Sequence, residues 1–117
     1  MTEKVELSKE KRIKKELAKL KRAFKDLDKN KKINAESRME RAAFLTVCLE
    51  DLEEIINQEG YEDEYQNGET QKGTTQSNAV KTHIAMTRNL TVIMKQLDEL
   101  VPPERKEKSK LALLRDE

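Results

Sequence analysis

The chain has 117 residues, of which 40% are charged and 35% apolar, and it contains no Trp, two Tyr and two Phe. Soluble domains average about 25% charged and about 45–50% apolar residues, so this chain has too few large apolar side chains for a compact monomeric core. The composition favours one domain of long helices that share narrow apolar seams between subunits.

Several classes of protein are excluded by the same sequence. No apolar segment approaches the roughly 18–20 residues that cross a bilayer, and the N-terminus lacks the apolar region of a secretory signal. The single cysteine, Cys48, excludes a disulfide framework and a cysteine-based zinc site. We therefore expect a soluble, intracellular protein without membrane contact.

Charge is distributed unevenly along the chain. Residues 1–33 carry 13 basic and 6 acidic side chains, residues 34–76 carry 3 and 11, and residues 77–117 carry 8 and 6, so the net charges are +7, −8 and +2. A basic arm beside an acidic segment is typical of a protein that offers one end to a polyanion. Pairing of acidic and basic segments between subunits would produce the same pattern.

The first predicted helix runs from about Ser8, its expected N-cap, to Asp28, and the segment 28–32 is expected to end it. Its apolar residues follow a heptad spacing, and they are Ile13, Leu17, Leu20, Phe24 and Leu27. Basic residues cover the other faces. They indicate either an ordinary soluble amphipathic helix or a set of phosphate contacts, which would be salt-sensitive and blind to sequence.

The second predicted helix runs from about Asn34 or Ser37 to Glu59. Ten apolar residues fall within Ala42–Ile56, so this helix should be buried on more than one side and form the centre of the fold. Gly60 is expected to stop it, because glycine readily adopts the left-handed conformation that ends many helices.

Residues 61–76 are rich in turn-forming and polar residues. Asn67-Gly68 is the preferred pair for a type I′ turn, in which both central residues need a positive φ. The segment therefore indicates either a short β-hairpin, which would need a neighbour to pack on, or a flexible loop.

The third predicted helix runs from about Asn78 to Leu100, with Ser77 as N-cap and Pro102-Pro103 as the stop. It carries two seams. The first consists of Met86, Leu90, Ile93, Leu97 and Leu100, and the second, more polar one consists of Val80, Ile84, Thr87, Thr91, Met94 and Val101. One seam can pair with the second helix, which leaves the other for a neighbouring subunit.

The residues that would support catalysis are not arranged for it. Gly60, Gly68 and Gly73 sit at turn-like positions rather than in a phosphate-binding loop. His83 has no acid or nucleophile at helical spacing, and Cys48 lies in the most apolar helix, where a core position is expected. The acidic residues indicate a solvated face more than a metal site. We expect no enzymatic activity, no cofactor and no metal.

The central part of the chain resembles the small subunit of phage terminases. The resemblance extends from about Glu40 to Pro103, and the family often has Pro where this chain has Asn78. The matching segments are Glu59-Gly60, Tyr65-Gln66-Asn67-Gly68-Glu69 with Gln71 and Gly73, Ser77-Asn78-Ala79-Val80, and Ile93-Met94-Lys95-Gln96-Leu97.

The resemblance implies a ring-like homo-oligomer in the host cytoplasm. Such rings bind double-stranded viral DNA at the packaging start and regulate the large subunit, which holds the ATPase and nuclease. The residues expected to contact DNA are Lys11, Lys14, Lys15, Lys21, Arg22 and Lys25. The tail 104–117, with Leu111, Leu113 and Leu114, is the expected contact for the large subunit.

The predicted fold is all-α: a long antiparallel helical hairpin over 34–103, a basic N-terminal helix over 1–33 and a charged tail over 104–117. The positions expected to form the helical seam and the oligomer interface are Leu45, Leu49, Leu52, Ile56, Met86, Leu90, Ile93 and Leu97. Two alternatives stay open. One is a helical adaptor that binds only protein, and the other is a helix-turn-helix regulator with its turn at 28–34.

Overall fold

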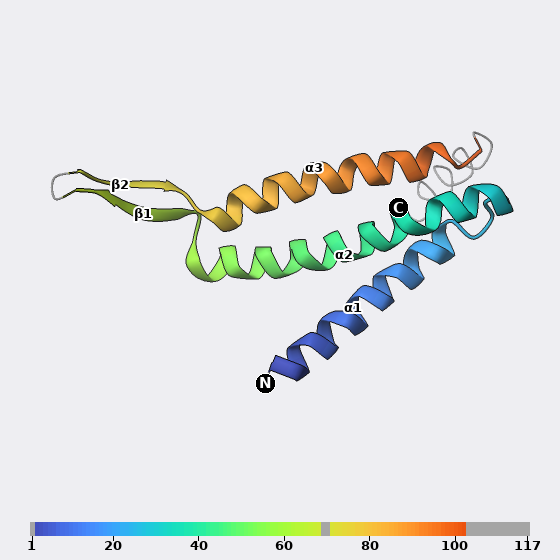
Figure 1. Ribbon diagram of the computed structural model, residues 1–117, viewed down its shortest axis with the longest axis horizontal. Coiled ribbons are helices and arrows are strands. Elements are labelled where there is room, and N and C mark those ends of the chain that lie inside the picture. Colours follow the sequence, from blue (N-terminus) through green and yellow to red (C-terminus); the bar gives the residue numbers. More distant parts are fainter. Residues whose placement is uncertain (1, 69–70, 103–117) are drawn as a thin grey trace, which may run out of the picture.

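The structure is a computed structural model that describes residues 2–68 and 71–102. Three helices, α1 (Thr2–Ala23), α2 (Lys29–Glu59) and α3 (Asn78–Glu99), accompany one antiparallel sheet of two strands, β1 (Glu62–Asn67) and β2 (Gln71–Gln76). Figure 1 shows α2 between α1 and α3, with the β-hairpin projecting beyond one end of the helices. The predicted helical fold is confirmed, and of the two alternatives for residues 61–76 the structure has the β-hairpin.

Helix α1 differs from its prediction at both ends. It begins at Thr2 rather than at Ser8, so Ser8 lies inside the helix and caps nothing. It ends at Ala23 rather than at Asp28, because the chain turns over the next residues and brings Leu27 into the core, where its side chain is 6% exposed. The predicted seam is confirmed: Ile13, Leu17, Leu20 and Phe24 are half-buried and Leu27 is buried.

Helix α2 begins five residues before the predicted Asn34. Asp28 is its N-cap residue, and the Lys32 N–H donates to the Asp28 carbonyl over 2.8 Å. Residues 29–32, predicted to end the first helix, instead form the first turn of the second, since lysine is a good helix former. The expected domain boundary at 33/34 therefore falls inside α2. Gly60 ends the helix with φ of +85°, as predicted.

Helices α2 and α3 form the predicted antiparallel pair. Arg38 Nε donates to Gln96 Oε1 over 3.2 Å near one end, and His83 Nε2 lies 3.0 Å from Glu53 Oε2 near the other. Ser77 caps α3 as predicted, because its Oγ accepts a hydrogen bond from the Val80 N–H over 3.1 Å. The helix ends at Glu99, one residue before the prediction.

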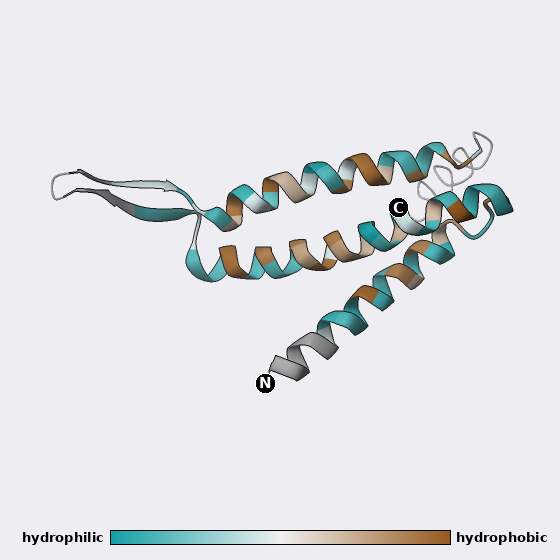
Figure 2. Cartoon of the chain, viewed as in Figure 1, coloured by the Kyte–Doolittle hydropathy of each residue, from teal (hydrophilic) through white to brown (hydrophobic). Residues whose placement is uncertain are grey.

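The core is concentrated where the end of α1, the start of α2 and the end of α3 meet. Leu27, Ala35, Met39 and Leu97 form a buried cluster there. Half-buried side chains on α1, on α3 and just after these two helices pack against it, and they are Leu17, Leu20, Phe24, Ile93, Met94, Leu100 and Val101. Figure 2 shows that apolar residues continue along much of α2, while the start of that helix is hydrophilic.

The eight positions expected in the helical seam lie between α2 and α3 of one chain. Leu49 and Leu97 are buried, and the other six are half-buried. Because successive helical residues are rotated by about 100°, the four positions on each helix lie on the face that also carries the Arg38–Gln96 and Glu53–His83 contacts between α2 and α3.

The connection between the strands differs from the predicted two-residue turn. Asn67 belongs to β1 and pairs with Gln71, so the strands are joined through positions 68–70. Gly68 has φ of +81°, whereas Asn67 keeps an ordinary strand conformation. The antiparallel register runs from Glu62 opposite Gln76 to Asn67 opposite Gln71.

Several large apolar side chains stay accessible among the residues that the structure describes. Their exposed fractions are 71% for Ile33, 47% for Phe44, 41% for Ile55, 69% for Tyr61, 44% for Ile84 and 55% for Val92. In the second predicted seam of α3, Ile84, Thr87 and Thr91 are exposed. Among the described helices, none is long and apolar enough to cross a bilayer. The tail 104–117 lies outside the described residues.

Candidate nucleic-acid interface

Helix α1 separates its apolar and basic residues onto opposite faces. Because successive residues are rotated by about 100°, Ile13, Leu17, Leu20 and Phe24 share the side that packs on the rest of the fold. The residues on the opposite side are Lys11, Lys14, Lys15, Lys21, Arg22 and Lys25, which we call the basic face, and all six are exposed. These are the six cations that the sequence assigns to DNA.

The basic face is largely free of internal ion pairs. Lys21 Nζ lies 3.7 Å from Glu36 Oε1 of α2, so this cation is partly neutralised within the chain. The other five cations of the face have no ion pair with any residue between 8 and 102 that the structure describes. Within the described part of the chain, five lysine and arginine charges on and just after α1 are therefore not neutralised by an ion pair.

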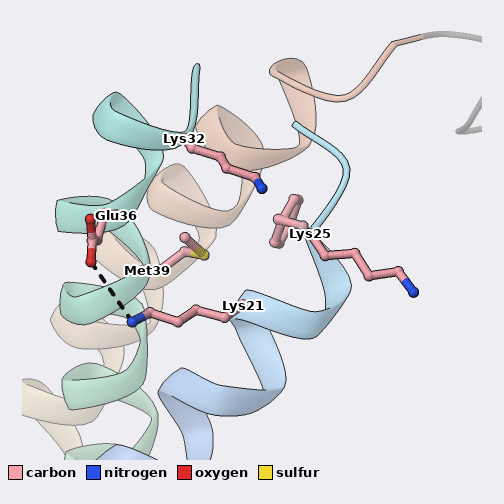
Figure 3. A pocket seen from close by; sticks show the side chains of 6 residues that line it. Lys21, Lys25, Lys32, Glu36 and Met39 are labelled. Carbon is pink, nitrogen blue, oxygen red and sulfur yellow. Dashed lines mark ion pairs between the residues drawn. The ribbon is translucent and has the colours of Figure 1, made fainter. Parts of the chain in front are cut away.

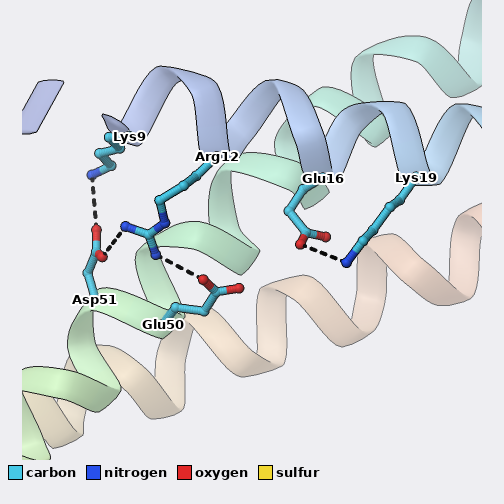
Figure 4. A network of polar contacts seen from close by, with 6 residues as sticks. All are labelled: Lys9, Arg12, Glu16, Lys19, Glu50 and Asp51. Atoms are coloured by element: carbon cyan, nitrogen blue, oxygen red, sulfur yellow. Dashed lines mark hydrogen bonds and ion pairs between the residues drawn. The ribbon is translucent and has the colours of Figure 1, made fainter. Parts of the chain in front are cut away.

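Two other cations of α1, Lys9 and Arg12, contact carboxylates of α2, whereas Lys19 pairs with Glu16 of α1 itself (Figure 4). Arg12 Nη1 donates to Asp51 Oδ1 over 2.7 Å, and Arg12 Nη2 donates to Glu50 Oε2 over 2.9 Å. These hydrogen bonds raise the pKa of the Arg12 guanidinium above its ordinary value. Lys9 Nζ adds a longer contact of 4.0 Å to Asp51 and lies 5.6 Å from the centre of the Phe44 ring.

This network gives a second explanation for the uneven distribution of charge along the sequence. The basic first segment and the acidic second segment pair with each other inside one chain, through Lys9, Arg12 and Lys21. Exposed ion pairs of this kind contribute only about 0.2–1 kcal/mol each to stability. Their larger effect is on the surface potential, because they neutralise part of the basic segment and leave the basic face as its free remainder.

The dimensions of the basic face suit a DNA backbone. Lys11 and Arg22 are 11 residues apart on α1, which corresponds to about 17 Å at a rise of about 1.5 Å per residue. That length exceeds the roughly 12 Å width of the major groove, so cations near the two ends can reach phosphates on both sides of a groove. Ala18 lies at the centre of the face and is exposed, so no side chain beyond its methyl group stands between the cations.

A cavity of about 250 Å³ opens at the junction of α1 and α2 (Figure 3). Phe24 and Met39 supply its apolar lining, and Lys21, Lys25, Lys32 and Glu36 supply the polar part. Lys32 was missed by the sequence reasoning, which assigned residues 28–32 to a helix stop. Its place beside Lys21 and Lys25 follows from α2 starting at Lys29, which no local pattern in the sequence indicated.

Cys48 and His83, the other two side chains that could take part in chemistry, both lie within the packing of the helices. Cys48 is a free cysteine and buried. His83 is half-buried and contacts Glu53 of α2, an acid that helical spacing along α3 alone did not reveal. Within residues 2–68 and 71–102, no group of three or more His, Cys, Asp or Glu side chains is placed to hold a metal ion.

The chain was also compared with known proteins. No protein-family model, no curated protein and no solved structure matches it.

Proposed function

We propose that this protein is the small subunit of a phage terminase. In this proposal it is a non-catalytic ring-like oligomer that binds double-stranded viral DNA at the packaging start. It recruits and regulates a large subunit that carries the ATPase and nuclease. The proposal rests on the resemblance of residues 40–103 to that family and, above all, on one structural observation: five cations of the exposed basic face have no ion pair among the residues that the structure describes.

The basic face supports a phosphate contact in particular. Phosphate contacts supply most of the affinity of sequence-independent DNA binding, and they need cations that are both exposed and free of internal carboxylates. Lys11, Lys14, Lys15, Arg22 and Lys25 meet both conditions, whereas Lys9 and Arg12 of the same helix do not. In an oligomer each contact is repeated, so a weak attraction per chain becomes strong by multivalency.

Exposed apolar side chains support the oligomer. Ile84 and Val92 on α3 and Ile33 and Ile55 on α2 are at least 41% exposed in the single chain. A second copy of the chain would remove this apolar surface from water, which stabilises association by about 25 cal/mol per Å². The proposed contact of 104–117 with the large subunit concerns residues outside the described part of the chain.

The salt dependence of DNA binding tests the proposal, with two matched double variants of α1. Lys14→Gln with Arg22→Gln removes one lysine and one arginine from the basic face, and Lys9→Gln with Arg12→Gln removes the same two types from the network with α2. Each lost phosphate contact lowers the slope of log affinity against log salt by about 0.9. We expect the first variant to lower the slope by about 2 per bound chain.

The second variant is the control, because it changes the net charge equally. It should leave the slope close to that of the wild type and lower the free energy of unfolding by about 1 kcal/mol, since it breaks exposed ion pairs. Equal slopes for the wild type and the variant of Lys14 and Arg22 would remove the basic face from the DNA contact. A wild-type protein whose DNA affinity is insensitive to salt would overturn the proposed function.

A second candidate is a helical adaptor that binds protein and never DNA. The observation in its favour is the pairing of Lys9, Arg12 and Lys21 with carboxylates of α2, because it lowers the positive charge that the sequence alone suggests. This candidate predicts that neither double variant changes any binding to duplex DNA. The same salt series therefore separates the two functions.

A further inference from the structure

The β-hairpin is exposed in a way that the rest of the fold does not explain. Its two strands project beyond the ends of α2 and α3, and no third strand joins the sheet in the described part of the chain (Figure 1). Isolated two-stranded hairpins are marginally stable in water. Glu62, Asp63 and Glu64 of β1 and Thr74, Thr75 and Gln76 of β2 are all exposed, so no apolar core supports this part of the hairpin.

The base of the hairpin is nevertheless held firmly on the helices. The Ser77 N–H donates to the Tyr61 carbonyl over 2.8 Å, and the Asn78 N–H donates to Asp63 Oδ2 over 3.2 Å. Ser77 is itself buried and caps α3. The hairpin therefore continues the helical pair as a fixed projection.

The hydrogen bond at Ser77 also determines which backbone groups face outward. In an antiparallel ladder, hydrogen-bonded pairs alternate with pairs that share no backbone hydrogen bond. Because the Ser77 N–H donates to the Tyr61 carbonyl, the next pair, Glu62 opposite Gln76, is of the second kind. By the same alternation, the Glu64–Thr74 and Gln66–Lys72 pairs also share no backbone hydrogen bond. The N–H and C=O groups of these residues point away from the partner strand, so each strand presents an unpaired edge.

The two edges differ in charge. Three consecutive carboxylates, Glu62, Asp63 and Glu64, lie on β1, whereas Thr74, Thr75 and Gln76 on β2 carry no charge. Pairing of β1 with β1 would bring six carboxylates together and is disfavoured. Pairing of β1 with β2 places the carboxylates beside hydroxyl and amide donors instead.

We propose that β2 of one copy pairs with β1 of the next copy, so that the hairpins of the oligomer join into one continuous antiparallel sheet. Copies related by rotation about an axis parallel to the hairpin bring these two edges together in antiparallel directions. Such a contact uses different surfaces on its two sides and closes into a ring when the rotation permits. This inference rests on the proposed oligomer and assigns the contact that joins its copies at the hairpin end.

Hydrogen exchange of single amides tests the pairing in the wild-type protein. By the register of the ladder, the amides of Thr74 and Gln76 point away from β1, whereas the amide of Thr75 points toward β1. We expect assembly to slow exchange at Thr74 and Gln76 at least tenfold relative to the dilute, dissociated protein. The amide of Thr75 should be protected in both states.

A proline variant supplies the second measurement. Thr74→Pro removes an outward N–H and no bond of the hairpin itself, and proline is tolerated on edge strands. Thr74→Val keeps the N–H and is its control. We expect Thr74→Pro to raise the concentration needed for assembly at least tenfold, with helix content and Thr75 protection unchanged, and Thr74→Val to assemble like the wild type.

The outcomes separate the pairing from the proposed function. An assembled wild type whose Thr74 and Gln76 amides exchange like free edges would overturn the strand pairing and leave the oligomer and its DNA binding intact. Normal assembly of Thr74→Pro would do the same. A wild type that stays at the monomer mass would overturn the oligomer on which both rest.

Discussion

Ala18 is the small uncharged residue among the cations of the basic face. It is exposed at the centre of that face, with Lys14 and Lys15 on one side along α1 and Lys21, Arg22 and Lys25 on the other. A small uncharged side chain here lets a phosphate approach several cations at once. The same position tests the site without disturbing any contact of the fold.

Replacing Ala18 by Glu should weaken DNA binding roughly tenfold at low salt, equivalent to about 1.4 kcal/mol. A carboxylate at this position repels the phosphates and draws the neighbouring lysines into pairs along the helix. Ala18→Gln has nearly the same shape and no charge, so it should bind DNA almost like the wild type. Titration of a labelled duplex measures both affinities, and equal affinities for the two variants would place the DNA contact elsewhere.

The roles of some single residues could be predicted from the sequence, whereas the contacts of others could not. The six cations of the basic face could be predicted because the heptad of apolar residues from Ile13 to Leu27 defines the opposite side of the helix. The partners of Arg12 and Lys21 could not, because Asp51 and Glu36 lie on another helix whose register against α1 depends on the packing of three helices. The Glu53–His83 contact escaped prediction for the same reason.

Among the elements, those with strong local signals were predicted best. Ser77, Gly60 and the prolines after α3 each act through the backbone of a few neighbouring residues, so the limits of α3 and the end of α2 agree with expectation within one residue. The start of α2 was missed by five residues because lysine-rich segments carry no stop signal of their own. The change from helix to turn after Ala23 reflects burial of Leu27, which is a tertiary effect.

The N-cap of α3 provides a prediction at this scale. Ser77 is 6% exposed, and its hydroxyl accepts the hydrogen bond from Val80 while its own N–H holds the base of the hairpin. Ser77→Ala should lower the free energy of unfolding by about 1 kcal/mol. Ser77→Thr keeps the hydroxyl and should lose markedly less. Urea unfolding followed by circular dichroism measures both, and an unaffected Ser77→Ala would show that this cap contributes nothing to stability.

For the whole molecule, an elongated shape and an incomplete core belong together. The chain measures 63 by 33 by 30 Å, and its buried residues lie at the end where the three helices meet and along α2 as far as Leu49. Toward the hairpin, Ile55, Ile84 and Tyr61 stay exposed because α1, α2 and α3 have no further element to cover them. We attribute this surface to contacts with other copies, in agreement with the low aromatic content of the sequence.

The mass of the wild-type protein in solution tests this account most directly. Light scattering at micromolar concentration, at low and high salt and with and without duplex DNA, should give a defined multiple of the 13.6 kDa chain. High salt should release the DNA and leave the multiple intact, because apolar contacts and not ion pairs are proposed to hold the copies together. A mass of one chain under all of these conditions would contradict it.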